Sequence, residues 1–429
     1  MQTTLHILII LFSLLFFLKY RHRVILFIPV YLILFDVIYG FYQTGSGFGT
    51  HRNIALTLLV VYFILIFRKI VVLNIWMTIY LLYVLLLVPF SSNFVESMQG
   101  YLSVFASMLL FPVGFYFIRN YSELKVLNTS MIVLASIFVI NSLISSVFGL
   151  GFDYYGGGVT LGGFITSKLF SASLFLVLLP VILPLTDKTI PKIYIILISG
   201  LVFVFLLLSM RRTSIFIPVF GFILYFIFSQ KKMLSIATFS VFAFMLLFAY
   251  PFYKDALENQ FRARRETLEE TSLDQEYRYK EAFIVVSETF SDLKTGLFGK
   301  EIFNSSGNYN QGKWGTRPIH IDYDLILHGS GIIGLILYLM IFADIFFKYV
   351  RYASSVPNDL YMNELKSLFK ILLILILLIS FNGGMLQLSY RATIFLYLGA
   401  LLGIFHKYYK YATGQSDDLA VSDNQNVEK

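Results

Sequence analysis

The sequence of 429 residues predicts an all-α, polytopic membrane protein with about 13 (12–14) transmembrane helices and one large external loop. Three observations indicate this class. Of the residues, 58% are hydrophobic and only 14% are charged, whereas a soluble domain carries about 25% charged residues. The apolar residues form runs of about 14 to 28 residues separated by polar loops, as membrane-spanning helices do. Basic residues collect in alternate loops, as expected for loops on two sides of a membrane.

The apolar runs give the order of the expected helices. Ten runs occupy residues 1–250 and three occupy residues 320–411. The polar segment 251–319 between them is expected to form the external loop, and the polar tail 412–429 is expected to be disordered. The runs are 5–18, 24–42, 54–67, 71–90, 100–118, 130–150, 168–185, 193–209, 213–229, 233–250, 320–347, 367–382 and 391–406.

Composition excludes several classes of site. The chain contains no cysteine, so it forms no disulfide, iron–sulfur cluster or thiolate zinc site. Its net charge of +8 does not indicate nucleic-acid binding, because the basic residues border apolar runs and do not form a soluble basic surface.

The basic residues also predict an orientation. With the N-terminus outside, 18 Lys and Arg fall in inner loops and the tail, and five fall in short outer loops. Because Lys and Arg are enriched on the cytoplasmic side, the N-terminus and segment 251–319 are expected outside and the C-terminus in the cytoplasm. The five outer cations are Arg52, Lys168, Arg211, Arg212 and Arg391.

The adjacent pair Arg211 and Arg212 occupies a turn of a few residues between two expected helices. A guanidinium binds two oxygens at once and stays charged, so this pair is a candidate for binding phosphate or pyrophosphate. Arg317 and Arg391 are expected on the same face and are candidates for the same role. Anchoring of the helices to lipid headgroups is the alternative.

Asp36 lies inside an apolar run. An ionised carboxylate near the centre of a bilayer costs roughly 2.5–3.5 kcal/mol on insertion scales. We therefore expect Asp36 to be protonated, to face water or to be paired, with a hydrogen bond to a tyrosine as the simplest structural role.

The segment from Arg317 to Gly334 places titratable residues where the polar loop meets an apolar run. Pro318 favours a helix start, which would put His320 in the first turn. There the helix dipole favours the neutral ring that a general base requires. Asp324, four residues further, is expected to orient that ring. The alternative is an interfacial residue without a chemical role.

Asp322 and Asp324 match the Asp-x-Asp pattern of metal-dependent glycosyltransferases. A metal site requires more carboxylates, so we expect no metal.

In segment 274–290, Phe283, Val286 and Phe290 recur at helical spacing. That helix is expected to lie on the membrane surface or to cover a cavity.

The order of these motifs resembles that of bacterial O-antigen ligases and Wzy-type polysaccharide polymerases. That family carries His-(Asn/Ser/Gln)-x9-Gly-x2-(Gly/Thr/Tyr) after its large periplasmic loop, and His320, Gly331 and Gly334 have this spacing. Position 321 departs from the pattern, because it is Ile. Two shorter matches are Arg278 followed by a helix and Gly296-Leu-Phe-Gly299, and the segment 209–213 around the arginine pair. The resemblance covers about residues 200–350.

The resemblance implies a GT-C-type glycosyltransferase at the periplasmic face of the bacterial cytoplasmic membrane. The expected donor is a glycan on undecaprenyl pyrophosphate, and the chemistry is inverting and needs no metal or cofactor. His320 is then the base, and Arg211, Arg212 and Arg278 bind the pyrophosphate. The expected partners are the lipid-linked oligosaccharides, the bilayer and a chain-length regulator protein, with no nucleic acid.

Three functions remain open at this point. A polymerase moves the growing glycan onto the next lipid-linked repeat unit, and Ile321 favours this choice. A ligase moves the glycan onto a lipid A core or another acceptor. A flippase for the same lipid-linked glycan is the alternative of another class, although such transporters show internal repeats and polar sites near the midplane.

Overall fold

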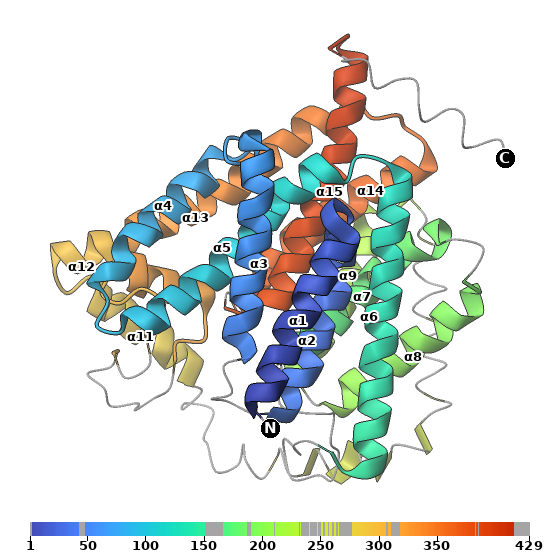
Figure 1. Ribbon diagram of the computed structural model, residues 1–429, viewed down its shortest axis with the longest axis horizontal. Coiled ribbons are helices and arrows are strands. Elements are labelled where there is room, and N and C mark those ends of the chain that lie inside the picture. Colours follow the sequence, from blue (N-terminus) through green and yellow to red (C-terminus); the bar gives the residue numbers. More distant parts are fainter. Residues whose placement is uncertain are drawn as a thin grey trace.

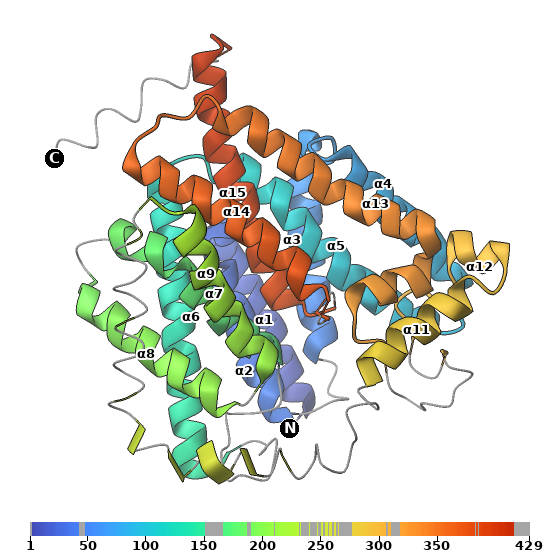
Figure 2. The same ribbon diagram turned by 180° about the vertical axis from the view of Figure 1, so that it is seen from behind.

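The computed structural model describes an all-α protein (Figures 1 and 2). Its described residues are 2–42, 48–150, 166–186, 190–209, 211–230, isolated positions from 232 to 265, 277–305, 308–309, 318–381, 383–384 and 386–415. The helices are α1 (Gln2–Tyr20), η1 (Arg21–Phe27), α2 (Ile28–Tyr42), α3 (Phe48–Ile66), η2 (Arg68–Ile70), α4 (Ile75–Leu87), η3 (Val88–Phe90), α5 (Phe94–Phe117), α6 (Tyr121–Phe148), α7 (Thr166–Leu185), α8 (Lys192–Leu208), α9 (Arg212–Phe228), α11 (Tyr277–Thr289), α12 (Leu293–Phe298), α13 (Asp322–Ala353), α14 (Leu360–Ile379) and α15 (Leu388–Ala412).

The helices confirm a multi-pass membrane protein by their length and hydropathy. Within the described residues, five helices are long and apolar enough to cross a membrane: Phe94–Phe117, Tyr121–Phe148, Lys168–Leu185, Asp322–Ala353 and Leu388–Ala412. Other apolar helices, including α3, α4, α8 and α9, are shorter. Twelve of the thirteen predicted runs coincide with a helix. The remaining run, 233–250, lies almost entirely outside the described residues, as does most of the tail 412–429.

The core of the bundle is the contact between α5 and α15, and α15 is buried along its apolar span. Glycines bring the two backbones together. A Cβ at Gly399 would lie 1.9 Å from the carbonyl oxygen of Phe111, and one at Gly403 would lie 2.5 Å from that of Phe115. Small residues let transmembrane helices pack at such short range, so this pair forms a rigid centre for the fold.

Antiparallel packing brings several helix ends together. Ser229, just after α9, donates to Glu364 near the start of α14 (2.7 Å), so the start of α9 lies near the end of α14. Ser380, just after α14, accepts from Arg391 near the start of α15 (3.2 Å). We call this region, where α9, α13 and α15 begin and α14 ends, the site end of the bundle. α15 ends on the opposite side (Figure 1).

One part of the molecule projects sideways at the site end. α4 and α13 lie side by side and are inclined to α1, α2 and α3, and α11 and α12 lie at the far end of this pair (Figures 1 and 2). Residues 322–353 form one long helix with a break at Gly331, where φ is +63°. The break separates a short polar segment from an apolar one.

Candidate functional site

His320 lies at the site end in an extended segment, next to the buried carboxylate of Glu281 on α11. The Glu281 side chain is 0% exposed and the His320 side chain is 40% exposed. Oε1 of Glu281 accepts from the backbone N–H of His320 (2.6 Å) and of Ile321 (3.2 Å). Oε2 lies 3.3 Å from Nδ1 of His320. One carboxylate thus fixes both the backbone and the ring of His320.

The hydrogen bonds to Glu281 also determine its charge. Burial raises the pKa of Glu281, but the hydrogen bonds from the ring and backbone of His320 and from the backbone of Ile321 outweigh burial and hold the pKa below its ordinary value. Because an ionised carboxylate only accepts hydrogen bonds, we assign the ring proton of neutral His320 to Nδ1. Nε2 then carries a lone pair, as a general base requires.

The predicted helix start at Pro318 is wrong, because α13 begins at Asp322 and Ile321 caps it. The segment before Asp322 is not helical: Ile321 is extended (φ −81°, ψ 126°), and side chains from elsewhere in the protein bind the backbone N–H groups of this segment. Ile319 donates to Ser305 (2.9 Å) and His320 and Ile321 donate to Glu281. His320 therefore precedes the helix, and the first-turn dipole argument does not apply to it.

Asp324 does not orient the ring of His320 as predicted, since Glu281 occupies that position. Asp324 lies in the first turn of α13 and is buried, and it interacts electrostatically with Glu281. Its Oδ2 has no hydrogen-bond partner among the described residues. The two carboxylates therefore lie close together beneath His320.

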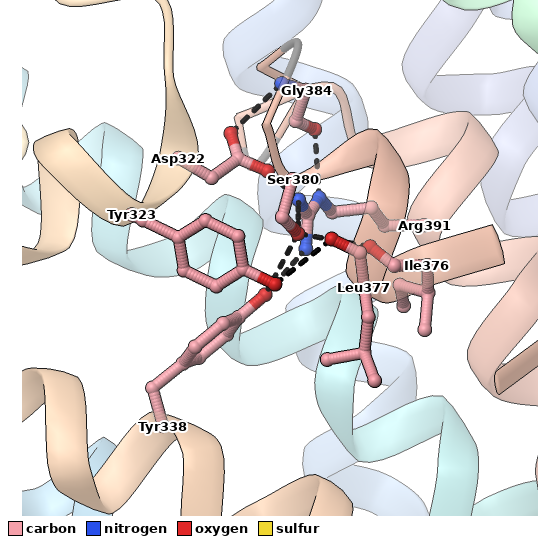
Figure 3. Close-up of polar contacts among 8 residues, drawn as sticks. All are labelled: Asp322, Tyr323, Tyr338, Ile376, Leu377, Ser380, Gly384 and Arg391. Atoms are coloured by element: carbon pink, nitrogen blue, oxygen red, sulfur yellow. Dashed lines mark hydrogen bonds and ion pairs between the residues drawn. The ribbon is translucent and has the colours of Figure 1, made fainter. Parts of the chain in front are cut away.

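Arg391 is buried beneath the same segment and forms an ion pair with Asp322, and both side chains are 2% exposed (Figure 3). Its Nε donates to the carbonyl oxygen of Gly384 (2.9 Å). Its other nitrogens donate to the hydroxyls of Tyr338 (3.1 Å) and Ser380 (3.2 Å). Four of the five guanidinium N–H groups are thus used within the protein. Arg391 joins the starts of α13 and α15.

The turn between α14 and α15 holds the His320 segment from the other side. Asp322 donates its N–H to the carbonyl oxygen of Ser380 (2.9 Å) and accepts from the N–H of Gly384 (2.8 Å) (Figure 3). Gly383 has φ +81°, and a Cβ there would lie 1.7 Å from the carbonyl oxygen of His320. Only glycine suits this position, because of both its conformation and its contact.

Glycines also dock α12 onto α13. A Cβ at Gly331 would lie 2.3 Å from the carbonyl carbon of Leu297, and one at Gly299 would lie 2.4 Å from the backbone of Gly329. Gly331 thus permits the close approach of α12 to α13. The two short glycine motifs, around Gly299 and Gly331, are therefore in direct contact.

The arginine candidates differ in their placement. Arg211 is half-buried and Arg212 is exposed at the start of α9, which is at the site end. Arg278 lies in α11, one turn before Glu281, but its side chain is outside the described residues. Arg317 lies entirely outside the described residues.

Asp36 is paired, as one of its expected alternatives required, and Arg52 is a partner in this pairing. Arg52 also donates to Ser389 at the start of α15 (3.2 Å). Lys168 on α7 is buried and interacts electrostatically with Asp36. Two of the outer cations thus take part in a buried polar cluster near the start of α15. Among the described residues, no group of three or more His, Asp or Glu side chains is arranged to hold a metal ion.

The sequence did not reveal Glu281 as part of the site. On α11 the apolar positions Phe283, Val286 and Phe290 are exposed, whereas Glu281 and Val285 are buried. The available signal was the spacing of Glu281 and Val285. Residues four positions apart lie on the same face of a helix, so this spacing places a charged residue beside a buried apolar one. No known protein family model and no characterised protein matches the sequence of this chain.

Proposed function

We propose that this protein is a membrane glycosyltransferase that joins oligosaccharide repeat units carried on undecaprenyl pyrophosphate. The observation that carries the proposal is the contact between His320 and Glu281. It presents a half-exposed imidazole at one end of an apolar bundle, with its proton assigned to Nδ1. A base in this place suits a hydroxyl acceptor that approaches from the membrane surface.

The proposed step is a single displacement. Nε2 of His320 takes the proton of the acceptor hydroxyl while that oxygen attacks the anomeric carbon of the donor sugar. The bond from that carbon to the pyrophosphate oxygen breaks, and undecaprenyl pyrophosphate leaves. Attack from the face opposite the leaving group inverts the anomeric centre. Ionised Glu281 stabilises the imidazolium that forms, as a carboxylate beside a catalytic histidine does.

The arginines take two roles in this proposal. Arg211 and Arg212 bind the departing pyrophosphate, supported by their position at the site end, where Arg211 is half-buried and Arg212 is exposed. Arg278 and Arg317 remain candidates for the same role. We assign Arg391 to positioning, because its guanidinium is buried and bound to Asp322, Tyr338, Ser380 and Gly384.

We also propose 12 to 14 membrane crossings, a GT-C-like arrangement and the bacterial cytoplasmic membrane as location. The N-terminus is then outside, the C-terminus is in the cytoplasm and the site end faces the periplasm. The opposite ends reached by the start of α1 and the end of α15 support an odd number of crossings (Figure 1). A chain-length regulator is the proposed protein partner.

A polymerase is preferred to a ligase because of Ile321, where the family pattern has a small polar residue. In the structure, Ile321 contributes its backbone N–H to Glu281, a bond that needs no polar side chain. A ligase uses the same donor, so it stays the second candidate.

A gel of surface glycan from a strain that lacks this protein tests the proposal. A single repeat unit on its normal anchor supports the polymerase. Polymer that accumulates on the undecaprenyl carrier indicates a ligase, and precursor retained on the cytoplasmic side indicates a flippase. The latter two results overturn the polymerase.

His320→Ala tests the base within the same strain. We expect chain elongation to fall by about 10²–10⁴-fold, the usual contribution of a general base. His406→Ala, at the end of α15 away from the site, is the matched control. Long-chain glycan at normal level in the His320→Ala strain, with equal protein in the membrane, contradicts the assignment.

A further inference from the structure

The outer helices α11 and α12 carry a continuous exposed apolar face. It consists of Phe283, Val286, Phe290, Leu293 and Phe298, and Phe283 and Leu293 are 77% and 80% exposed. The buried side of α11 is formed by Glu281, Val285 and Thr289. The apolar residues of this amphipathic helix thus point away from the protein core, so something other than the described core covers them.

The apolar face continues the surface of the membrane-spanning helices. Leu86 and Phe90, at the outer end of α4 and in η3, are exposed, and Phe90 is 83% exposed. The turn after Phe90 is bound to the segment after α12, because Ser91 donates to Glu301 (2.7 Å) and the N–H of Ser92 donates to the same carboxylate (3.0 Å). These bonds hold the exposed apolar residues at the end of α4 close to the segment that follows α12.

The break in α13 gives the depth of α12. From position 332 the helix continues unbroken to Ala353, and the helix Asp322–Ala353 is long and apolar enough to cross a membrane. The backbone of α12 abuts Gly331, where this unbroken part begins. α12 thus lies beside the end of the span, at the level where hydrocarbon meets headgroups.

Exposed lysines border the same face. Lys280 on α11, Lys294 on α12 and Lys300 just after α12 are all exposed. Lysine side chains beside an apolar surface extend to phosphate groups at a bilayer interface. Lys280 and Lys294 can therefore reach anionic lipid headgroups, although the exposed carboxylate of Asp292 lies between the two lysines in the sequence.

We propose that α11 and α12 form an interfacial anchor, with Phe283, Val286, Phe290, Leu293 and Phe298 immersed in the outer edge of the bilayer. The occupant of this surface is lipid. Because Glu281 is on α11 and binds His320, the anchor fixes the height of His320 above the hydrocarbon. This inference concerns the membrane only and holds whether or not the protein transfers sugars.

The chain contains no cysteine, so an introduced cysteine carries a single spin label. We would label the full-length protein at Phe283→Cys and Leu293→Cys and place it, one molecule per disc, in phosphatidylcholine–phosphatidylglycerol nanodiscs. Lys280→Cys and Lys294→Cys, exposed on the same two helices outside the apolar face, are the matched controls. Collision rates with oxygen, which concentrates in lipid, and with a water-soluble nickel chelate are then compared.

We expect labels at 283 and 293 to collide severalfold more with oxygen than with the chelate, and control labels to show the reverse. A preference for the chelate at 283 and 293 means that the face lies in water and overturns the anchor. Low collision rates with both reagents mean that protein covers the face, which also overturns it. All four positions are exposed, so these substitutions leave the packed core intact.

Discussion

Two buried carboxylates flank His320, and their basic partners differ in exposure. Asp322 pairs with Arg391, and both side chains are 2% exposed. Glu281 is 0% exposed, but its partner ring on His320 is 40% exposed. The first pair is closed to solvent and joins two helices, whereas the second presents one reactive edge. The ion pair that is buried on both sides thus serves the fold, whereas the contact between Glu281 and His320 leaves one edge of the ring accessible.

Disrupting the buried ion pair between Asp322 and Arg391 should have the largest effect on stability. Arg391→Met leaves Asp322 buried without its cation, and we expect a loss of about 3–5 kcal/mol in the free energy of unfolding. Thermal unfolding in detergent and the yield of folded protein measure this loss. Arg391→Met combined with Asp322→Asn removes the orphaned charge and should recover part of it. A single variant as stable as the parent would show that the pair does not hold the fold.

Disrupting the pair of Glu281 and His320 should have a smaller effect on stability than disrupting the pair of Asp322 and Arg391, and a larger effect on activity. Glu281→Gln weakens the bonds to two backbone N–H groups, with an expected cost of about 1–3 kcal/mol. Without the negative charge, the imidazolium formed in the reaction loses its stabilisation, so elongation should fall by about tenfold or more. Unfolding and glycan length are measured on the same preparation. Normal elongation at reduced stability would make Glu281 a purely structural residue.

The lowered pKa of Glu281 gives the pH dependence of this contribution. A carboxylate whose folded pKa is depressed stabilises the fold above its unfolded pKa of about 4.3, and this stabilisation is lost as pH falls through the folded value. The stability difference between the parent and Glu281→Gln should narrow as pH falls below about 4.3, because the carboxylate then gains its proton.

Glu301→Gln provides a comparison for the pH dependence of stability that we expect for Glu281→Gln. Burial raises its pKa, but hydrogen bonds from Ser91, Ser92 and Asn304 outweigh burial and lower it. The stability difference for Glu301→Gln should therefore change with pH in the same direction, but less, since Glu301 is closer to solvent. A stability difference for Glu281→Gln that widens as pH falls below about 4.3 would contradict the assigned ionisation.

Exposed Arg212 should show the smallest effect. Arg212→Lys keeps the charge and loses the planar fork, so we expect elongation to fall by about tenfold or less, or ~1 kcal/mol, with stability unchanged. Arg68→Lys, an exposed arginine away from the site end, is the control. Equal activity of the two variants would favour lipid anchoring by Arg212 over pyrophosphate binding.

Hydropathy predicted the helices but not their ends. The runs 100–118 and 130–150 correspond to helices that start six and nine residues earlier, at Phe94 and Tyr121. Those starts are set by Asn93 and Asn120, whose side chains accept from the backbone of the first turn. Hydropathy marks the lipid-facing part of a helix, whereas caps mark its end.

The site was predictable only where one residue carried the signal. His320 was found from its position and spacing. Its partner Glu281 is 39 residues away, and Arg391 is 69 residues from Asp322. Neither pairing has a local pattern, because each depends on how distant helices pack. The apolar residues of α11 mark its exposed face, whereas Glu281 lies on its buried face.

The contacts around His320 have a consequence for biogenesis. The segment is held by Glu281 from the preceding loop and by Ser380, Gly384 and Arg391 from the last two helices, directly or through Asp322. A ribosome must therefore release almost the entire chain, and the insertion machinery must deliver α15, before the site exists. Partly synthesised chains in the membrane would lack these contacts, so the arrangement around His320 forms only in nearly completed molecules.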